Sequence, residues 1–219
     1  MLASSLSRPP MRAPQSAPLP SSPSLPDARH AALVFVDRSH PQRPELESFI
    51  QAVYGARYGA RLHGFMPMLV ALRDAQGDLL AAAGYRDAGT QPLYLERYLD
   101  RPVEQLLAAG AGAPPARARI AEVGHLAAAQ AGQGRRLILQ LGPQLAAQGF
   151  EWVVSTLTEE LRHLFRRLGL APLALGMADP ALLGPEAADW GSYYEHRPLV
   201  LAGQIGPALQ ALARQRGAA

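Results

Sequence analysis

The stretch IAEVGHLAAAQAGQGRRLILQL, residues 120–141, decides the fold of this chain. Its first part indicates a strand, which leads into a turn that carries Gly132 and Gly134. Apolar residues then recur every three or four positions, which predicts a helix over residues 134–148. Residues 150–157 are rich in β-branched side chains and predict the next strand. A strand, a glycine turn, a helix and a second strand in this order indicate the core of an α/β domain.

The flanking sequence extends this alternation in both directions. Strands are expected at residues 31–36, 67–73, 79–86, 116–126, 170–175 and 198–201, and helices at 44–60, 92–109 (broken at Pro102), 159–168 and from 207 onward. We expect Pro143 to kink the central helix, Thr158 to cap the helix that follows it, and Gly169 to end that helix. This order predicts a mixed central sheet with helices on both faces.

The chain divides into a leader and one domain. Residues 1–28 are rich in Pro, Ser and Ala, and they lack the apolar run of a secretory signal. We therefore expect residues 1–28 to be a disordered leader and residues 29–219 to be a single α/β domain.

Composition excludes several classes of function. The formal charge is +3, every basic side chain among the 21 is Arg, and the Arg residues are interspersed with acidic ones, so no basic stripe for nucleic acid is present. The absence of Cys excludes disulfides, thiolate metal sites and cysteine nucleophiles. The six His residues form no metal-ligand pattern, so we expect no metal. No apolar run reaches the roughly 20 residues of a spanning helix, so we expect a soluble, cytoplasmic protein without stable membrane insertion.

Several segments together resemble a known family. They are YLERYLD at 94–100 followed by Pro102 and Glu104, IAEVGHLA at 120–127, WVVSTLT at 152–158, LRHLFRRLGL at 161–170 and WGSYY at 190–194. In this combination the chain resembles the thermostable hemolysin family, and its order of elements resembles the GNAT superfamily of N-acyltransferases. Residues 122–127 also resemble a strand motif of acyl-homoserine-lactone synthases and long-chain N-acyl amino acid synthases.

The resemblance implies an acyltransferase of bacterial lipid biosynthesis that uses acyl-CoA or acyl-ACP as donor and a small amine as acceptor. A helix N-terminus with glycines also suits a phosphate, because its backbone N–H groups are unpaired. The residues expected to bind the donor are Leu126, Ala127, Gly132, Gln133, Gly134, Arg135, Thr156, Arg162 and Phe165. The glycine spacing differs by one residue from the usual superfamily turn, so a plain glycine-rich helix start remains an alternative.

Glu122 is the candidate catalytic base, because an amine must lose a proton before it attacks a thioester. An ion pair of Glu122 with Arg117 or Arg119 is the structural alternative. His125 and Tyr194 are further catalytic candidates, the latter as a proton donor to the departing thiolate. The residues expected to contact the acceptor are Glu96, Asp100, Trp190 and Tyr193, for which a solvated face or packing is the alternative.

Two other functions remain open at this point. The family name describes a cytolytic protein acting on membranes, whereas the strands read as buried runs without an exposed amphipathic face. A surfactant-like lipid product would explain lysis indirectly. The unusual glycine spacing also leaves room for a non-catalytic module that binds an acyl carrier protein.

Overall fold

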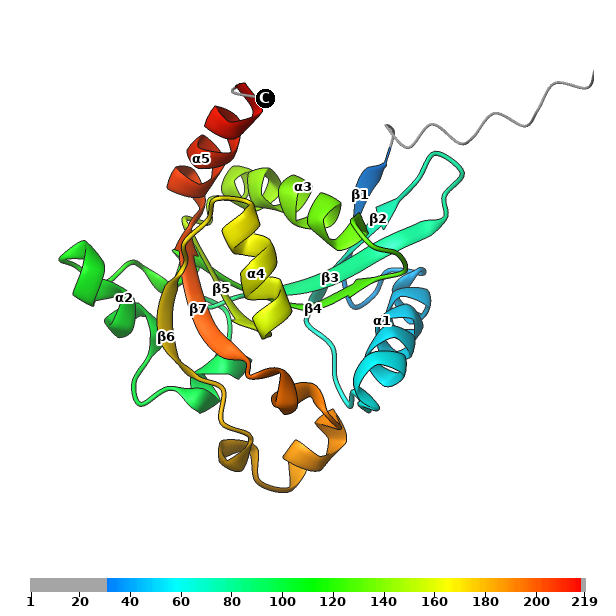
Figure 1. The fold of residues 1–219 in the computed structure, drawn as a ribbon, viewed down its shortest axis with the longest axis horizontal. Helices are drawn as coiled ribbons and strands as arrows, with labels where there is room; N and C mark the ends of the chain where they lie inside the picture. Colours follow the sequence, from blue (N-terminus) through cyan, green and yellow to red (C-terminus); the bar gives the residue numbers. More distant parts are fainter. Residues whose placement is uncertain (1–30, 218–219) are drawn as a thin grey trace, which may run out of the picture.

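The computed structural model describes residues 31–217, which form one sheet with helices packed on it (Figure 1). The predicted leader, residues 1–28, lies outside the described residues. The strands are β1 (Ala32–Val36), β2 (Met68–Arg73), β3 (Leu79–Asp87), β4 (Ile120–Ala128), β5 (Trp152–Leu157), β6 (Leu173–Met177) and β7 (Leu199–Gln204). The helices are α1 (Arg43–Tyr58), α2 (Val103–Ala111), α3 (Gln133–Ala147), α4 (Glu159–Arg167) and α5 (Ile205–Gly217). Short 3-10 segments cover Tyr94–Tyr98, Arg117–Arg119, Pro180–Trp190 and Tyr193–His196.

The seven strands follow the order β1-β2-β3-β4-β5-β7-β6. Only β4 and β5 run parallel to each other, and every other neighbouring pair of these strands is antiparallel. The sheet is therefore mixed, and helices cover both of its faces, which confirms the fold class expected from the sequence.

Alternating side chains of the central strands supply both layers of the core. In β2, Leu69 and Ala71 pack with α1, whereas Val70 and Leu72 pack with α3. In Figure 1 the sheet runs between α1 on one side and α3 on the other. We call these sides the α1 face and the α3 face.

Strand β4 carries an extra residue opposite β3. Between Gly124 and Ala127, the two residues His125 and Leu126 oppose the single residue Ala83, which is a β-bulge. His125 adopts a φ of 52°, which few residues other than glycine do. The bulge breaks the alternation, so that His125 lies with the aromatic rings of the α1 face and Leu126 packs in the core of the α3 face.

The parallel pair β4–β5 is held together over a short distance. Its register runs from Ile120 opposite Trp152 to Glu122 opposite Val154, and no pairing follows. Both strands continue beyond that point, β4 to Ala128 and β5 to Leu157. The two strands therefore part after Glu122, and the sheet is open there.

Helix α3 includes Pro143 within its length, and the kink expected there stays a prediction. Some other local expectations differ from the structure. Thr158 precedes α4 but makes no capping hydrogen bond, and its hydroxyl is buried without a partner, so the expected cap was wrong. Residues 117–119 form a 3-10 turn instead of the start of a strand, and β6 begins three residues later than expected. Gly169 does follow α4 with a positive φ of 66°.

Candidate functional site

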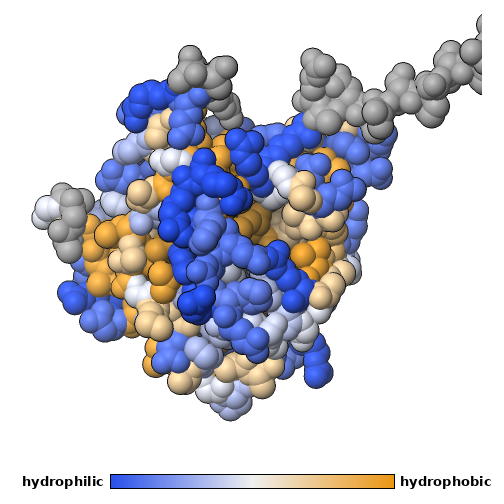
Figure 2. All heavy atoms as spheres, viewed as in Figure 1, coloured by the Kyte–Doolittle hydropathy of each residue, from blue (hydrophilic) through white to orange (hydrophobic). Residues whose placement is uncertain are grey.

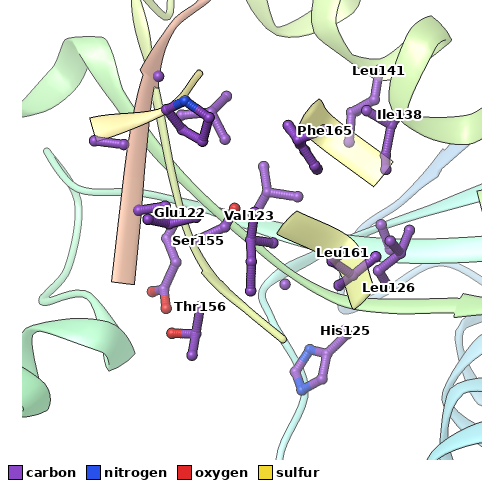
Figure 3. Close-up of a pocket in the computed structure, with 18 of the residues that line it drawn as sticks. Glu122, Val123, His125, Leu126, Ile138, Leu141, Ser155, Thr156, Leu161 and Phe165 are labelled. Atoms are coloured by element: carbon purple, nitrogen blue, oxygen red, sulfur yellow. The ribbon is translucent and has the colours of Figure 1, made fainter. Parts of the chain in front are cut away.

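A single cavity of about 750 Å³ passes through the opening between β4 and β5. On the α1 face it forms a front chamber, lined by Tyr54, Tyr58, Arg86, Tyr94, Tyr98, Glu122, His125, Thr156, Trp190 and Tyr193. On the α3 face it forms a back chamber, lined by Val123, Leu126, Leu137, Ile138, Leu141, Leu145, Phe165 and Leu209. In Figure 3 Glu122, Thr156 and His125 point to one side of the strands, and Ile138, Leu141 and Phe165 lie on the other.

Glu122 lies at the point where β4 and β5 part. Its side chain is 5 % exposed, and its two oxygens accept hydrogen bonds from the backbone N–H groups of Tyr94 (2.8 Å) and Leu95 (3.1 Å). Arg86 lies on β3, directly opposite Glu122, and its guanidinium is 3.3 Å from the Glu122 carboxylate. Burial raises the pKa of Glu122 above its usual value, and the charge of Arg86 opposes this rise. The two backbone N–H groups and Arg86 therefore hold the carboxylate in place.

His125 is a neutral neighbour of this pair. Burial, with a smaller contribution from Arg86 and Arg43, lowers the pKa of His125 to about 4. Its ring packs against Tyr54 and Phe65, and its Nδ1 atom is buried without a hydrogen bond to any described residue. An uncharged imidazole here is a hydrogen-bonding group and not a cation.

Aromatic rings form the wall of the front chamber. Trp190 contacts Tyr54, Tyr94 and Tyr193 with ring centroids 5.2–6.5 Å apart, and Tyr58 packs edge-on against Tyr193. Burial raises the pKa of each of these tyrosines, so their hydroxyls stay protonated. The wall is an apolar surface with neutral hydroxyl groups.

The back chamber is apolar and is closed by α4. Leu161 and Phe165 turn inward from this helix, while none of its residues is fully buried. Figure 2 shows hydrophilic residues along α4 in the middle of this face, with hydrophobic residues on both sides of it. Gly142 of α3 also lines the chamber, and a Cβ atom placed there would lie 3.5 Å from Leu209.

A pair of loops closes the rim of the front chamber. The N–H of Arg61 donates to the Asp189 carbonyl (2.6 Å), and His63 Nε2 lies 3.1 Å from the Asp189 carboxylate. Gly191 has a φ of 52°, and a Cβ atom at this position would lie 2.0 Å from the Tyr58 carbonyl oxygen. Only glycine fits this contact, which joins the end of α1 to the loop before β7.

The structure brings some of the predicted residues together. The cavity lining contains Glu122, His125, Leu126, Thr156, Phe165, Trp190 and Tyr193. Tyr194 lies just outside, where its hydroxyl is 2.6 Å from that of the lining residue Tyr98. Ala127 is buried on the α1 face away from the lining. These positions concentrate the predicted catalytic residues in one place.

Other predicted residues lie elsewhere. Arg162 binds the carbonyls of Leu157 and Arg197 and so fastens the end of β5. Gly132, Gln133 and Arg135 line a separate hollow at the start of α3, and the Cβ position of Gly134 is 4.0 Å from the lining residue Leu126. The glycine turn therefore adjoins the cavity without lining it.

The two carboxylates predicted to bind the acceptor lie outside the main cavity, and one of them is paired with an Arg. Glu96 accepts hydrogen bonds from Arg117 (2.7 and 3.0 Å), which also binds Glu104. Asp100 is exposed beside Arg101. Neither carboxylate lines the main cavity, so their positions do not support a role in binding the acceptor. Arg117 pairs with Glu96 and Glu104, and Arg119 pairs with Glu151, so the structural alternative in which Glu122 pairs with either Arg is not what the structure shows.

Sequence reasoning missed most of the front chamber. Arg86, Tyr54, Tyr58, Tyr94 and Tyr98 all line it. The pair Tyr54 and Tyr58 was visible as an i, i+4 aromatic pair on the helical face that is buried. Arg86 carries no comparable signal, because only the register of β3 against β4 places it beside Glu122.

Neither a metal-binding cluster nor a membrane-spanning helix is seen in residues 31–217. No group of three or more His, Asp or Glu side chains in this range could hold a metal ion. None of the helices described there is long and apolar enough to cross a membrane.

Solved structures share this fold and define its class. TofI, solved with an inhibitor and MTA, superposes with a TM-score of 0.57 at 19% identity, covering 84% of this chain and 96% of TofI. BjaI, a CoA-dependent acyl-homoserine lactone synthase solved with SAM and isopentyl-CoA, has a TM-score of 0.57 at 14% identity. The match covers 86% of this chain and 90% of BjaI. FeeM, an N-acyl amino acid synthase from uncultured soil microbes, has a TM-score of 0.54 at 13% identity. The match covers 82% of this chain and 94% of FeeM. The fold is therefore that of GNAT-like acyltransferases.

Within this class the family is defined by sequence. A family model described as thermostable hemolysin matches residues 36–209, which is most of the chain. The chain belongs to the thermostable hemolysin family, as its motifs indicated. No curated protein matches the sequence.

Proposed function

We propose that the protein is an N-acyltransferase that moves a fatty acyl group from an acyl-CoA or acyl-ACP thioester to an amine. The observation that carries this proposal is the cavity between the parted strands β4 and β5, with buried Glu122 at the parting. Its two chambers differ in chemistry, one apolar and one lined by polar and aromatic groups. Two substrates of different polarity fit such a cavity, with the reacting atoms between the strands.

The back chamber is the proposed site of the acyl chain. Its lining residues from β4, α3, α4 and α5 are apolar, and each methylene group buried among them contributes about 0.8 kcal/mol. Beyond Glu122 the backbone of β4 has no strand partner on the side of β5. N–H groups there are suited to bind the thioester oxygen as negative charge develops on it.

Glu122 is the proposed base. The amine nitrogen attacks the thioester carbon, the N–C bond forms, the C–S bond breaks, and the thiolate leaves. The proton that the nitrogen loses passes to Glu122, directly or through a water molecule. His125, being neutral, accepts or donates a hydrogen bond without competing for this proton.

Tyr194 has a smaller part in this proposal than its sequence suggested. Its hydroxyl reaches the cavity only through Tyr98, and burial raises the pKa of both phenols. A phenol with a raised pKa is a poor proton donor to a thiolate. We assign Tyr194 to holding Tyr98, and the thiolate takes its proton from solvent.

The glycine turn remains the proposed contact for the donor's phosphate. The turn begins a helix of 15 residues, carries Arg135 and adjoins the cavity at Leu126. A pantetheine arm that leaves the back chamber past Leu126 would meet the unpaired N–H groups of α3. Both a CoA pyrophosphate and the phosphate of a carrier protein fit this chemistry, and both donors agree with the cytoplasmic location expected from the sequence.

The second candidate is the cytolytic activity that the family name describes. In the proposed reaction the product joins an apolar chain to a polar head and is therefore an amphiphile. Lysis of cells would follow from this product, and the protein would need no membrane insertion of its own.

The enzyme proposal is tested by incubating the purified chain with acyl-CoA and acyl-ACP of varied chain length and a panel of amines. Release of free thiol and formation of an amide, both dependent on the amine, are expected. Glu122→Gln is the matched control, because it keeps the shape of the side chain and removes the base. If no donor gives thiol release or amide formation, the proposal is contradicted.

A further inference from the structure

Arg86 has more hydrogen-bond donors than partners. The guanidinium group has five N–H donors. Within the described residues it makes one hydrogen bond, to the Pro92 carbonyl at 3.3 Å, and its Nε atom is buried without one. The side chain is 18 % exposed and lines the front chamber. Donors of a buried cation that face a cavity are costly unless a ligand or water accepts from them.

The acids of the front chamber satisfy this group only in part. Glu122 pairs with the Nε atom of Arg86 at 3.3 Å, and the terminal nitrogens of the guanidinium make only the one hydrogen bond to Pro92 within the described residues. Glu186 accepts from the Tyr94 hydroxyl (2.7 Å) and from Arg97 (2.6 Å). Asp189 is paired with His63. Arg86 is thus the cation with free donors beside the proposed base.

We propose that Arg86 binds the carboxylate of the acceptor, so that the acceptor is a free amino acid and not a simple amine. This inference rests on the proposed acyl transfer. A planar guanidinium matches a carboxylate with two parallel hydrogen bonds. Arg86 and Glu122 are cross-strand neighbours, and the carboxylate and amine of an α-amino acid are separated by one carbon atom. A zwitterion can therefore place its carboxylate on Arg86 and its amine at Glu122.

The aromatic wall indicates the acceptor's side chain. Tyr54, Tyr58 and Trp190 present the faces and edges of their rings to the same chamber. This aromatic surface suits an acceptor whose side chain is apolar or aromatic. The reaction joins acyl thioester and amino acid to give an N-acyl amino acid, a free thiol and one proton.

The test compares an amino acid with its decarboxylated amine. Phenylalanine and phenethylamine form one pair, and leucine and isoamylamine form a second. The ratio of kcat/KM for the two members of a pair is measured in the unaltered protein and in Arg86→Gln, Arg86→Lys, Arg61→Gln and Arg119→Gln. Arg61 is a second cation at the rim, and Arg119 lies outside the cavity.

The unaltered protein is expected to prefer the amino acid. Arg86→Gln should reduce that preference by about ten- to a hundredfold, the value of a charge-assisted hydrogen-bond pair. Because Arg86 also faces Glu122, this change lowers kcat/KM for the amino acid and for the amine alike. The ratio of the two kcat/KM values is therefore the quantity that reports on carboxylate binding. Arg86→Lys should retain part of the preference, and Arg119→Gln all of it.

Three results would separate the possibilities. If the unaltered protein acylates both members of a pair equally, acyl transfer stands and the role of Arg86 is overturned. If the preference follows Arg61 in place of Arg86, the assignment is overturned in the same way. If no acceptor gives thiol release, the proposed function itself fails.

Discussion

Glu122 faces Val154 at the last paired position of β4 and β5, and the two strands separate immediately beyond it. The buried carboxylate thus lies at the edge of an opening through the sheet. The sheet supplies the backbone on which the carboxylate is held, and in the proposed reaction the opening is the place where the two substrates meet.

Replacing Glu122 with Gln should abolish most of the activity. A positioned general base contributes roughly two to four orders of magnitude in rate, and the amide cannot accept the proton. The rate of thiol release measures this loss, and thermal unfolding shows whether the fold is retained. Glu151→Gln is the control, because Glu151 is exposed on the surface beside Arg119. An active Glu122→Gln protein would remove Glu122 from the mechanism.

The pH dependence should reflect Glu122 and not His125. Burial raises the pKa of Glu122 above 4.5, and the base must be ionised, so kcat/KM should fall as the pH drops through this raised pKa. His125, with a pKa of about 4, is already neutral throughout that range. His125→Asn, which tolerates the positive φ, should therefore leave the midpoint of the acidic limb in place. A shifted or missing limb in this variant would assign the titration to His125.

Filling the space at Gly142 should change the preferred acyl chain. Leu at this position would extend into the back chamber toward Leu209. We expect kcat/KM to fall for long acyl-CoA donors and to persist for short ones, measured over a series from butanoyl to hexadecanoyl. Gly142→Ala is the matched control, because one Cβ atom makes only an ordinary contact there. An equal loss for all donors would place the acyl chain elsewhere.

Replacing Gly191 with Ala should destabilise the protein by about 1–3 kcal/mol or more. The new Cβ atom would collide with the Tyr58 carbonyl oxygen, and the backbone has a positive φ. Gly184→Ala is the control, because Gly184 also has a positive φ of 60° but no atom within 4 Å of its Cβ position. The free energies of unfolding of both variants are measured in urea, and the difference between them gives the cost of the collision. Equal destabilisation would mean that backbone strain alone accounts for the loss.

Lysis of red blood cells should require the reaction. The purified chain should be inactive alone, and lysis should appear when an acyl thioester and an amine are supplied, because the amphiphilic product disrupts the membrane. Glu122→Gln with the same substrates provides the control. Lysis by the protein alone would favour the cytolytic candidate.

The sequence was sufficient for the fold because the signals there are local. Helical spacing in α3, the hairpin between β2 and β3 and Gly169 after α4 each depend on neighbours in the chain. The sequence also singled out Glu122, Trp190 and Tyr193, which line the cavity, because each lies in a recognisable segment. Arg86 and the Tyr98–Tyr194 hydroxyl pair were not, because strand register and packing between distant segments bring them to the cavity. The bulge at His125 was likewise not predicted, since its extra residue is defined only against β3.

The opening between β4 and β5 has a consequence for the end of the reaction. In the proposed reaction, an acyl chain in the back chamber and an acceptor in the front chamber become one molecule, which then extends through the sheet. This molecule leaves only if its tail is drawn forward past Glu122 or its head is drawn backward between the strands. If the head leaves backward, the width of that gap limits how bulky an acceptor the protein can turn over, whereas if the tail leaves forward, only the thin acyl chain passes through the gap.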